Sequence, residues 1–144
     1  MKKLLILGAG TAGTIMANKM ASHLDLDQWQ ITVVDRDGEH HYQPGYLFVP
    51  FGIYTARDIV KPRRDYLPRG VDVIFSGIEV IDAEKNQVRL TSGQVLGYDY
   101  LIIATGAHTD PSELEGLSGD GWRRNIFDFY TLDGAVALSR HLKS

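Results

Sequence analysis

Six residues near the beginning of the chain have the types and spacing of a turn that binds phosphate groups. Residues 8–13 read Gly-Ala-Gly-Thr-Ala-Gly, which fits G-x-G-x-x-G, and they separate an apolar run from a segment with helical periodicity. In such a turn the first glycine permits the tight bend, the second admits a pyrophosphate to the backbone, and the third lets helix and strand pack closely. The N-terminus of the helix then faces the anion. The residues predicted to surround a pyrophosphate are Gly8, Gly10, Thr11, Ala12 and Gly13.

An acidic residue follows at the distance expected of a second recognition group. Asp35 lies 22 residues beyond Gly13, at the end of the apolar run Gln30–Asp35. A carboxylate at this position accepts hydrogen bonds from the ribose of an adenosine. It argues against a ribose 2′-phosphate, although the neighbouring Arg36 keeps NADP open as a ligand; we expect Arg36 to face outward. The turn and the carboxylate together predict a dinucleotide site.

Two buried strands and a helix must position these groups. Leu4–Leu7 is a continuous apolar run, as in a buried parallel strand, and Thr11–Leu24 repeats apolar residues on one helical face. Gln30–Asp35 supplies the second strand, so the three segments form a right-handed βαβ unit. The apolar face of the helix is predicted to comprise Ile15, Met16, Met20 and Leu24.

The remaining segments predict an α/β fold, a Rossmann-like domain with a parallel sheet and an antiparallel β-hairpin crossover. Residues 38–52 form an ordered loop rich in aromatic residues, Ala56–Leu67 a helix that Pro62 breaks or kinks, and Asp133–Leu142 a last helix. A hairpin turns through residues 84–86. The further strands are expected at Val71–Phe75, Ile78–Asp82, Gln87–Thr91 and Tyr98–Ala104.

Composition excludes several classes of function. The 144 residues are 44% hydrophobic and 23% charged, and their net charge of −3 gives no general attraction for nucleic acid. Because the chain has no cysteine, disulfides, thiolate metal sites and thiol nucleophiles are excluded, and we expect no metal. No run approaches the roughly 20 apolar residues that span a bilayer, so we expect a soluble, cytoplasmic domain. The basic cluster at residues 61–64 is interpreted as a solvated helix start.

The last predicted strand carries a resemblance that bears on the choice of dinucleotide. The run that carries it is Tyr98-Asp99-Tyr100-Leu101-Ile102-Ile103-Ala104-Thr105-Gly106-Ala107. It resembles the apolar strand, closing with A-T-G, of the FAD domains in the pyridine nucleotide-disulfide oxidoreductase superfamily. The resemblance covers essentially the whole chain and implies FAD, with Asp35 on the ribose. It further implies that the backbone around Glu79 and Val80 meets the adenine, and that Ala104, Thr105 and Gly106 line the cofactor.

The loop after Asp35 narrows the resemblance within that superfamily. Residues 41–48 read His-Tyr-Gln-Pro-Gly-Tyr-Leu-Phe, which resembles the Y-Q-P-G loop of sulfide:quinone reductases and flavocytochrome c sulfide dehydrogenases. Pro44 and Gly45 would bring backbone flush against the isoalloxazine ring, with Tyr42, Tyr46 and Phe48 over its apolar edge. We expect no catalytic role for the loop histidines. The resemblance implies sulfide as electron donor, a quinone as acceptor and peripheral contact with the inner membrane.

Two departures from that family stand beside the resemblance. Where many sulfide:quinone reductases have a cysteine followed by a V-D-H-A-like stretch, residues 130–135 read Tyr-Thr-Leu-Asp-Gly-Ala, so no catalytic residue is identified. Relatives are also several times longer. We therefore expect residues 1–144 to be a truncated N-terminal FAD-binding domain, completed by a missing C-terminal half or a partner chain. We expect the chain alone not to turn over sulfide, and its uncovered apolar surface predicts a homodimer.

Two alternatives use the same nucleotide site. One is the FAD half of a type II NADH dehydrogenase or a ferredoxin reductase-like enzyme, in which a nicotinamide replaces sulfide as the donor. The other is a non-enzymatic module that binds a dinucleotide without flavin reduction. Good NADH kinetics would favour the first alternative, and tight nucleotide binding without electron transfer would favour the second.

Overall fold

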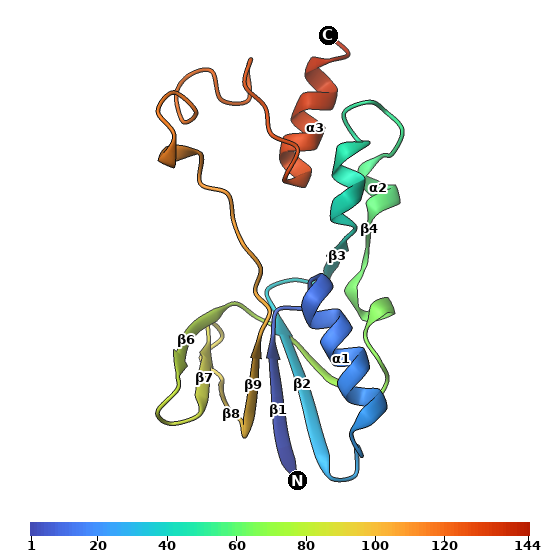
Figure 1. The fold of residues 1–144 in the computed structure, drawn as a ribbon, viewed down its shortest axis with the longest axis vertical. Coiled ribbons are helices and arrows are strands. Elements are labelled where there is room, and N and C mark those ends of the chain that lie inside the picture. Colours follow the sequence, from blue (N-terminus) through green and yellow to red (C-terminus); the bar gives the residue numbers. More distant parts are fainter. The chain divides into compact units, whose positions relative to one another are not determined.

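All 144 residues are described by the computed structural model, which divides them into two separately packed units. The first unit comprises residues 1–40 and 62–106, and the second comprises residues 41–61 and 107–144. The ribbon in Figure 1 follows the chain through both units in sequence order.

A four-stranded parallel sheet forms the centre of the first unit, with strand order β5-β2-β1-β9. Its strands are β1 (Lys2–Leu7), β2 (Trp29–Asp35), β5 (Asp72–Phe75) and β9 (Tyr100–Ile103). Leu4 of β1 pairs with Ile31 on one side and with Tyr100 on the other. The central position of β1 explains its unbroken apolar run, because side chains on both of its faces are buried.

The two faces of the sheet are covered by different elements of the same unit. Leu4 and Ile6 pack on the helix side, whereas Leu5 and Leu7 pack against an antiparallel meander. The meander consists of β6 (Ile78–Asp82), β7 (Gln87–Leu90) and β8 (Val95–Gly97). Figure 1 shows the meander and α1 on opposite sides of the sheet. The alternating side chains of β1 thus join both halves of the core.

The predicted hairpin is confirmed and gains a strand. β6 and β7 pair in antiparallel register from Asp82 with Gln87 onward, and β8 adds a third strand that the sequence pattern did not predict. The turn between β6 and β7 has Asn86 at a φ of 52°, a conformation that asparagine tolerates. β9 begins two residues later than expected, because the Tyr98 amide donates to the Asn86 carbonyl instead of joining the sheet.

Helix α1 (Thr11–His23) confirms the predicted helix but not all of its apolar face. Gly13 and Ala17 are its buried residues, and Met16, Met20 and Leu24 pack against the core beside them. The prediction for Ile15 was wrong, because this residue is 50% exposed. At about 100° per residue, Ile15 lies roughly 200° around the helix from Gly13. The small residues, and not the largest ones, therefore mark the packed face.

The helix predicted over residues 56–67 was also wrong beyond its first turn. Only Ala56–Ile59 (α2) is helical, and it begins with a capping box in which Thr55 and Asp58 bond each other's backbone amides. The residue before Pro62 is biased away from helix, and Val60–Pro62 (β4) instead pairs with Glu39–His41 (β3). Arg63–Tyr66 then forms a short 3₁₀ turn, η2.

The second unit has a small core of its own. It contains the 3₁₀ turn η1 (Gln43–Leu47), α2, a second short turn η3 (Pro111–Glu113) and α3 (Leu132–His141), which confirms the last predicted helix. Thr131 caps α3 by accepting from the Gly134 amide. The buried residues of this core are Tyr46, Val49, Ile59 and Ala135.

Candidate dinucleotide site

Two glycines of the turn are required by packing alone. Gly8 has a φ of 92°, which favours glycine, and a Cβ on it would collide with the backbone of Ala104. A Cβ on Gly13 would collide with the Gly8 carbonyl. These two contacts bring the ends of β1 and β9 and the start of α1 together, as the sequence predicts.

Gly10 differs from the other two glycines because it faces open space. It is exposed, and a Cβ built on it would meet no atom within 4 Å. Gly10 is also the N-cap of α1, where no side chain accepts a hydrogen bond from the helix and no acidic residue occupies the first turn. The first N–H groups of α1, including those of Thr11 and Ala12, therefore have no side-chain acceptor. This arrangement fits a pyrophosphate, which would supply the missing acceptors.

Asp35 lies beside the turn with one carboxylate oxygen committed and one available. Its side chain is 13% exposed. Oδ2 accepts a hydrogen bond from the Ala9 amide at 2.6 Å, which fixes the carboxylate against the glycine turn. The chain offers no hydrogen-bond donor to Oδ1. An adenosine ribose hydroxyl would find an oriented acceptor there.

Arg63 corrects the interpretation of the basic cluster as a solvated helix start. This residue is only 6% exposed. Its Nη1 lies 3.3 Å from Asp35 Oδ2 and donates to the Ala9 carbonyl, so it reaches both the carboxylate and the turn. A buried arginine is expected to be fully paired. Sequence spacing offered no sign of this contact, because Arg63 reaches the site only through the tertiary fold.

Arg36 faces outward, as predicted. Its side chain is 86% exposed, and its Nε lies 3.4 Å from Asp37 Oδ2. Partial burial raises the pKa of Asp37, but the Glu39 amide and the positive charges of Arg63 and Arg36 outweigh it, so that the pKa lies below the ordinary 3.8. Arg36 thus balances charge on the loop after β2 without contacting Asp35.

The remaining cofactor residues of the first unit fall in two places. The Ala104 amide donates to the Leu7 carbonyl at 2.7 Å, and the backbone of Ala104 and Thr105 lies against Gly8 of the glycine turn. Gly106 has a φ of 78° and open space around it. Glu79 and Val80 lie on β6 of the meander, where both are exposed and Glu79 pairs with Arg89 at 3.0 Å. No hydrogen bond links Glu79 or Val80 to the turn.

Pro44 and Gly45 lie in η1 of the second unit. Pro44 is exposed, whereas Gly45 is buried and a Cβ on it would collide with Ile59. Packing within its own unit is therefore enough to explain this glycine. Tyr46 is also a core residue, and its hydroxyl lies 2.8 Å from Nδ1 of His41. Burial, and then the charge of Asp133, raises the pKa of Tyr46 above 10.0.

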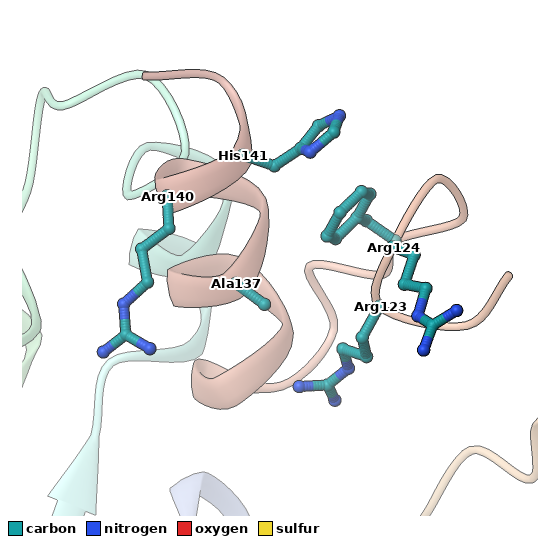
Figure 2. A pocket seen from close by; sticks show the side chains of 6 residues that line it. Arg123, Arg124, Ala137, Arg140 and His141 are labelled. Atoms are coloured by element: carbon teal, nitrogen blue, oxygen red, sulfur yellow. The ribbon is translucent and has the colours of Figure 1, made fainter. Parts of the chain in front are cut away.

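A hollow of about 490 Å³ in the second unit is lined partly by basic side chains. Their positive charges do not converge on one point of the hollow. Figure 2 shows Arg140 on one side of α3, and Arg123 and Arg124 across the hollow on the other. Arg123 is paired with Asp128 at 3.2 Å. The rings of Phe127 and His141, which also line the hollow, contact each other with their centroids 4.8 Å apart. The structure also has no cluster of three or more histidine, aspartate or glutamate residues that would hold a metal.

The family model described as pyridine nucleotide-disulphide oxidoreductase matches residues 2–144. The chain therefore belongs to this family of flavin-dependent oxidoreductases. Within it, the chain is 27% identical over 142 residues to the mitochondrial sulfide:quinone oxidoreductase of Dictyostelium discoideum, covering 99% of this chain and 31% of that protein. It is 26% identical over 144 residues to the type II NADH:quinone oxidoreductase of Staphylococcus haemolyticus, covering 34% of that protein. The predicted family is confirmed.

The same fold occurs in the crystal structure of the sulfide:quinone oxidoreductase from Aquifex aeolicus. The TM-score is 0.82 at 22% identity, over 99% of this chain and 32% of that one. This likeness confirms the predicted α/β fold with its parallel sheet and antiparallel crossover. The chain spans about a third of the length of these relatives. None of its helices is long and apolar enough to cross a membrane.

Proposed function

We propose that residues 1–144 form an FAD-binding domain of a flavin-dependent oxidoreductase of the sulfide:quinone type. The observation that carries the proposal is the open space over Gly10, at the uncapped start of α1 and beside the available oxygen of Asp35. A dinucleotide needs both groups together, an anion site for its pyrophosphate and an acceptor for its ribose.

Each residue of the site has a defined task in this proposal. The α1 N–H groups at Thr11 and Ala12 bind the pyrophosphate, and Asp35 Oδ1 accepts from the ribose. Ala104, Thr105 and Gly106 extend the cofactor-lining surface along the end of β9. Bound FAD would supply two-electron transfer between donor and acceptor, while the protein orients it and tunes its electronics. The adenine contacts of Glu79 and Val80, and the flavin contact predicted at Pro44 and Gly45, belong to the same proposal.

Sulfide as donor and a quinone as acceptor are supported by relatives. The relative from Dictyostelium discoideum is a mitochondrial sulfide:quinone oxidoreductase, and the Y-Q-P-G loop favours the same group. The chain has no cysteine to capture sulfide. We therefore place sulfide capture and quinone binding in residues outside this chain, supplied by a C-terminal half or a partner chain, with peripheral contact at the inner membrane.

The FAD-binding half of a type II NADH dehydrogenase is the second candidate. The Staphylococcus haemolyticus relative of that kind is 26% identical over 99% of this chain, close to the 27% of the sulfide:quinone relative. The two candidates differ in the electron donor and share the FAD site. Anaerobic addition of sulfide or NADH to the flavin-loaded chain, assembled with the C-terminal half or partner chain that supplies the donor site, distinguishes them at the flavin absorbance band. The proposal predicts that the chain alone does not reduce quinone with sulfide. Sulfide-dependent quinone reduction by the isolated chain would refute this division of labour.

Thermal unfolding with FAD, NADH or NADPH tests the cofactor directly. The proposal predicts that FAD raises the unfolding temperature and that neither nicotinamide does so at equal concentration, because a ligand that binds only the folded state stabilises it. A yellow protein after purification would agree with this result. Stabilisation by NADH or NADPH alone would contradict the assignment of FAD and would indicate a domain that binds a nicotinamide dinucleotide.

A further inference from the structure

The guanidinium of Arg63 makes four hydrogen bonds and one further ion pair within the chain. Nε donates to the Asp37 carbonyl at 3.1 Å. Nη1 donates to the Ala9 carbonyl and lies 3.3 Å from Asp35 Oδ2, and Nη2 donates to Asp37 Oδ1 and to the Glu39 carbonyl. All three nitrogens of this buried side chain therefore face acceptors of the chain itself.

These contacts tie three separate parts of the nucleotide site to one rigid group. Ala9 belongs to the glycine turn, Asp35 ends β2, Asp37 lies in the loop after it, and Glu39 begins β3. The backbone of Arg63 is held as well, because its amide donates to the Gly38 carbonyl at 2.7 Å. The planar fork of arginine suits this task, since its donors point in fixed directions.

The same contacts determine which oxygen of Asp35 remains available. The Ala9 amide and Arg63 Nη1 both lie at Oδ2, at 2.6 and 3.3 Å. They hold this oxygen against the turn and leave Oδ1 as the acceptor for the ligand. The guanidinium also balances a partly buried carboxylate that would otherwise stand next to the bound pyrophosphate, where like charges repel.

We infer that Arg63 is a positioning residue for the adenosine half of the ligand: it locks Asp35 and the Ala9 carbonyl, and it makes the site select a free ribose 2′-hydroxyl over a 2′-phosphate. Arg63 does not bind phosphate itself, because its side chain is buried and its three nitrogens face acceptors of the chain. The selection follows from an oriented carboxylate oxygen, Oδ1, which accepts from a ribose hydroxyl and repels a 2′-phosphate of like charge. This inference rests on the proposed dinucleotide function and goes beyond it by assigning a residue outside the glycine motif.

Equilibrium binding of FAD, ADP and 2′-phosphorylated ADP to the full chain tests the inference. Arg63→Gln is expected to weaken the binding of FAD and of ADP by about 10- to 100-fold, the range found in metal sites when a residue that orients a metal ligand is lost. The variant is also expected to lower the ratio of the affinity for ADP to the affinity for 2′-phosphorylated ADP. The matched control is Arg64→Gln, because Arg64 is exposed and lies over the Phe75 ring. This control should bind all three ligands as the wild type does.

A double-mutant cycle separates positioning from general damage. If Arg63 acts through Asp35, Arg63→Gln should weaken ADP by less than about threefold once Asp35→Asn is present, because interacting residues are not additive. Equal losses in both backgrounds would overturn the inference. Should Arg63→Gln fail to fold, Arg63→Lys replaces it in the cycle, since lysine keeps the charge but cannot span the same acceptors.

The outcomes distinguish this inference from the function on which it rests. A wild-type chain that binds neither FAD nor ADP would overturn the proposed function and the inference together. A wild-type chain that binds both, with Arg63→Gln unchanged within about twofold, would overturn the inference alone. A loss shared by FAD and ADP, coupled to Asp35 and accompanied by weaker 2′-phosphate discrimination, would support it.

Discussion

Arg63 and Asp35 lie 28 residues apart in the chain, yet Nη1 of the first is 3.3 Å from Oδ2 of the second. Both side chains are nearly enclosed, and both also contact Ala9 in the glycine turn. This arrangement makes the glycine turn and the Asp35 carboxylate one connected structure.

Asp35→Asn tests the ribose acceptor directly. We expect FAD and ADP to bind at least about tenfold more weakly, because the change removes the charge from the ribose acceptor and from its pair with Arg63. The discrimination against 2′-phosphorylated ADP should decrease in the same variant, since a neutral amide no longer repels the extra phosphate. Titration calorimetry with the two nucleotides measures both effects. Unchanged ADP affinity would contradict the assignment of Asp35.

Gly10→Ala separates ligand binding from folding. The φ of Gly10 is −68° and a Cβ there meets nothing, so we expect the free energy of unfolding to fall by no more than about 1 kcal/mol. The methyl group occupies the space proposed for the pyrophosphate, so FAD affinity should fall at least about tenfold, or about 1.4 kcal/mol. Urea unfolding without ligand and an FAD titration check the two parts.

Gly8→Ala and Gly13→Ala are the matched contrast to that variant. Each added Cβ would collide with backbone, and Gly8 also has a positive φ. We expect each change to lower the free energy of unfolding of the ligand-free chain by at least about 2 kcal/mol, through overpacking and backbone strain. The same urea titration measures it. Wild-type stability in either variant would mean that the close approach of β1, α1 and β9 is not required.

The lowered pKa of Asp37 predicts that the folded protein loses stability in acid. Its pKa is lowered in the folded protein, chiefly by the Glu39 amide and by Arg63 and Arg36 acting against burial. The stabilisation from its ionised form is therefore present above the unfolded-state pKa near 3.9 and is lost as the pH falls through the lowered folded value. Asp37→Asn should flatten this part of the stability curve. Equal acid sensitivity in both proteins, measured by urea unfolding from pH 6 down to about pH 2, would contradict the assignment.

The raised pKa of Tyr46 predicts that the folded protein loses stability in alkali. Burial, followed by the charge of Asp133, raises the pKa of its phenol, so the folded state favours the neutral form. The stabilisation is fully present below the unfolded-state pKa of about 10 and is lost as the pH rises through the raised folded value. Absorbance titration of tyrosinate should show one late transition that Tyr46→Phe removes. An unchanged late transition in that variant would assign it to another tyrosine.

Exposed apolar side chains of the second unit test the proposed homodimer. Leu47, Phe51 and Ile53 are all more than half exposed, and exposed apolar side chains are the residues that an interface would cover. We expect Phe51→Ser with Ile53→Ser to shift the chain toward monomer in sedimentation at micromolar concentration. Identical sedimentation of variant and wild type would remove these residues from any self-association surface.

Local patterns predicted the parts of the site that depend on neighbours in sequence. The glycine spacing predicted the turn, and its collisions with Ala104 and the Gly8 carbonyl show why the spacing is strict. Arg63 was missed because its partners lie 24 to 54 residues away in the chain. Ile15 was misassigned because two small residues define the packed helix face, and hydrophobicity gives them little weight.

The helix predicted over residues 56–67 failed for a related reason. Pro62 was expected to break or kink this helix, but the helix already ends at Ile59, because pairing of β4 with β3 satisfies the backbone that follows and the residue before Pro62 disfavours helix. Gly45 has a packing role that no local pattern reveals, because a Cβ on it would collide with Ile59. The flavin contact predicted at Gly45 stays a prediction beside this packing role.

Direct titration of the purified chain with FAD tests the central claim most simply. Flavin fluorescence and the visible spectrum should report saturable binding at one site per chain, with Gly10→Ala at least about tenfold weaker and Arg64→Gln unchanged. ADP should compete with FAD for the site, and 2′-phosphorylated ADP should not. Saturable binding of NADH or NADPH without any binding of FAD would contradict the account.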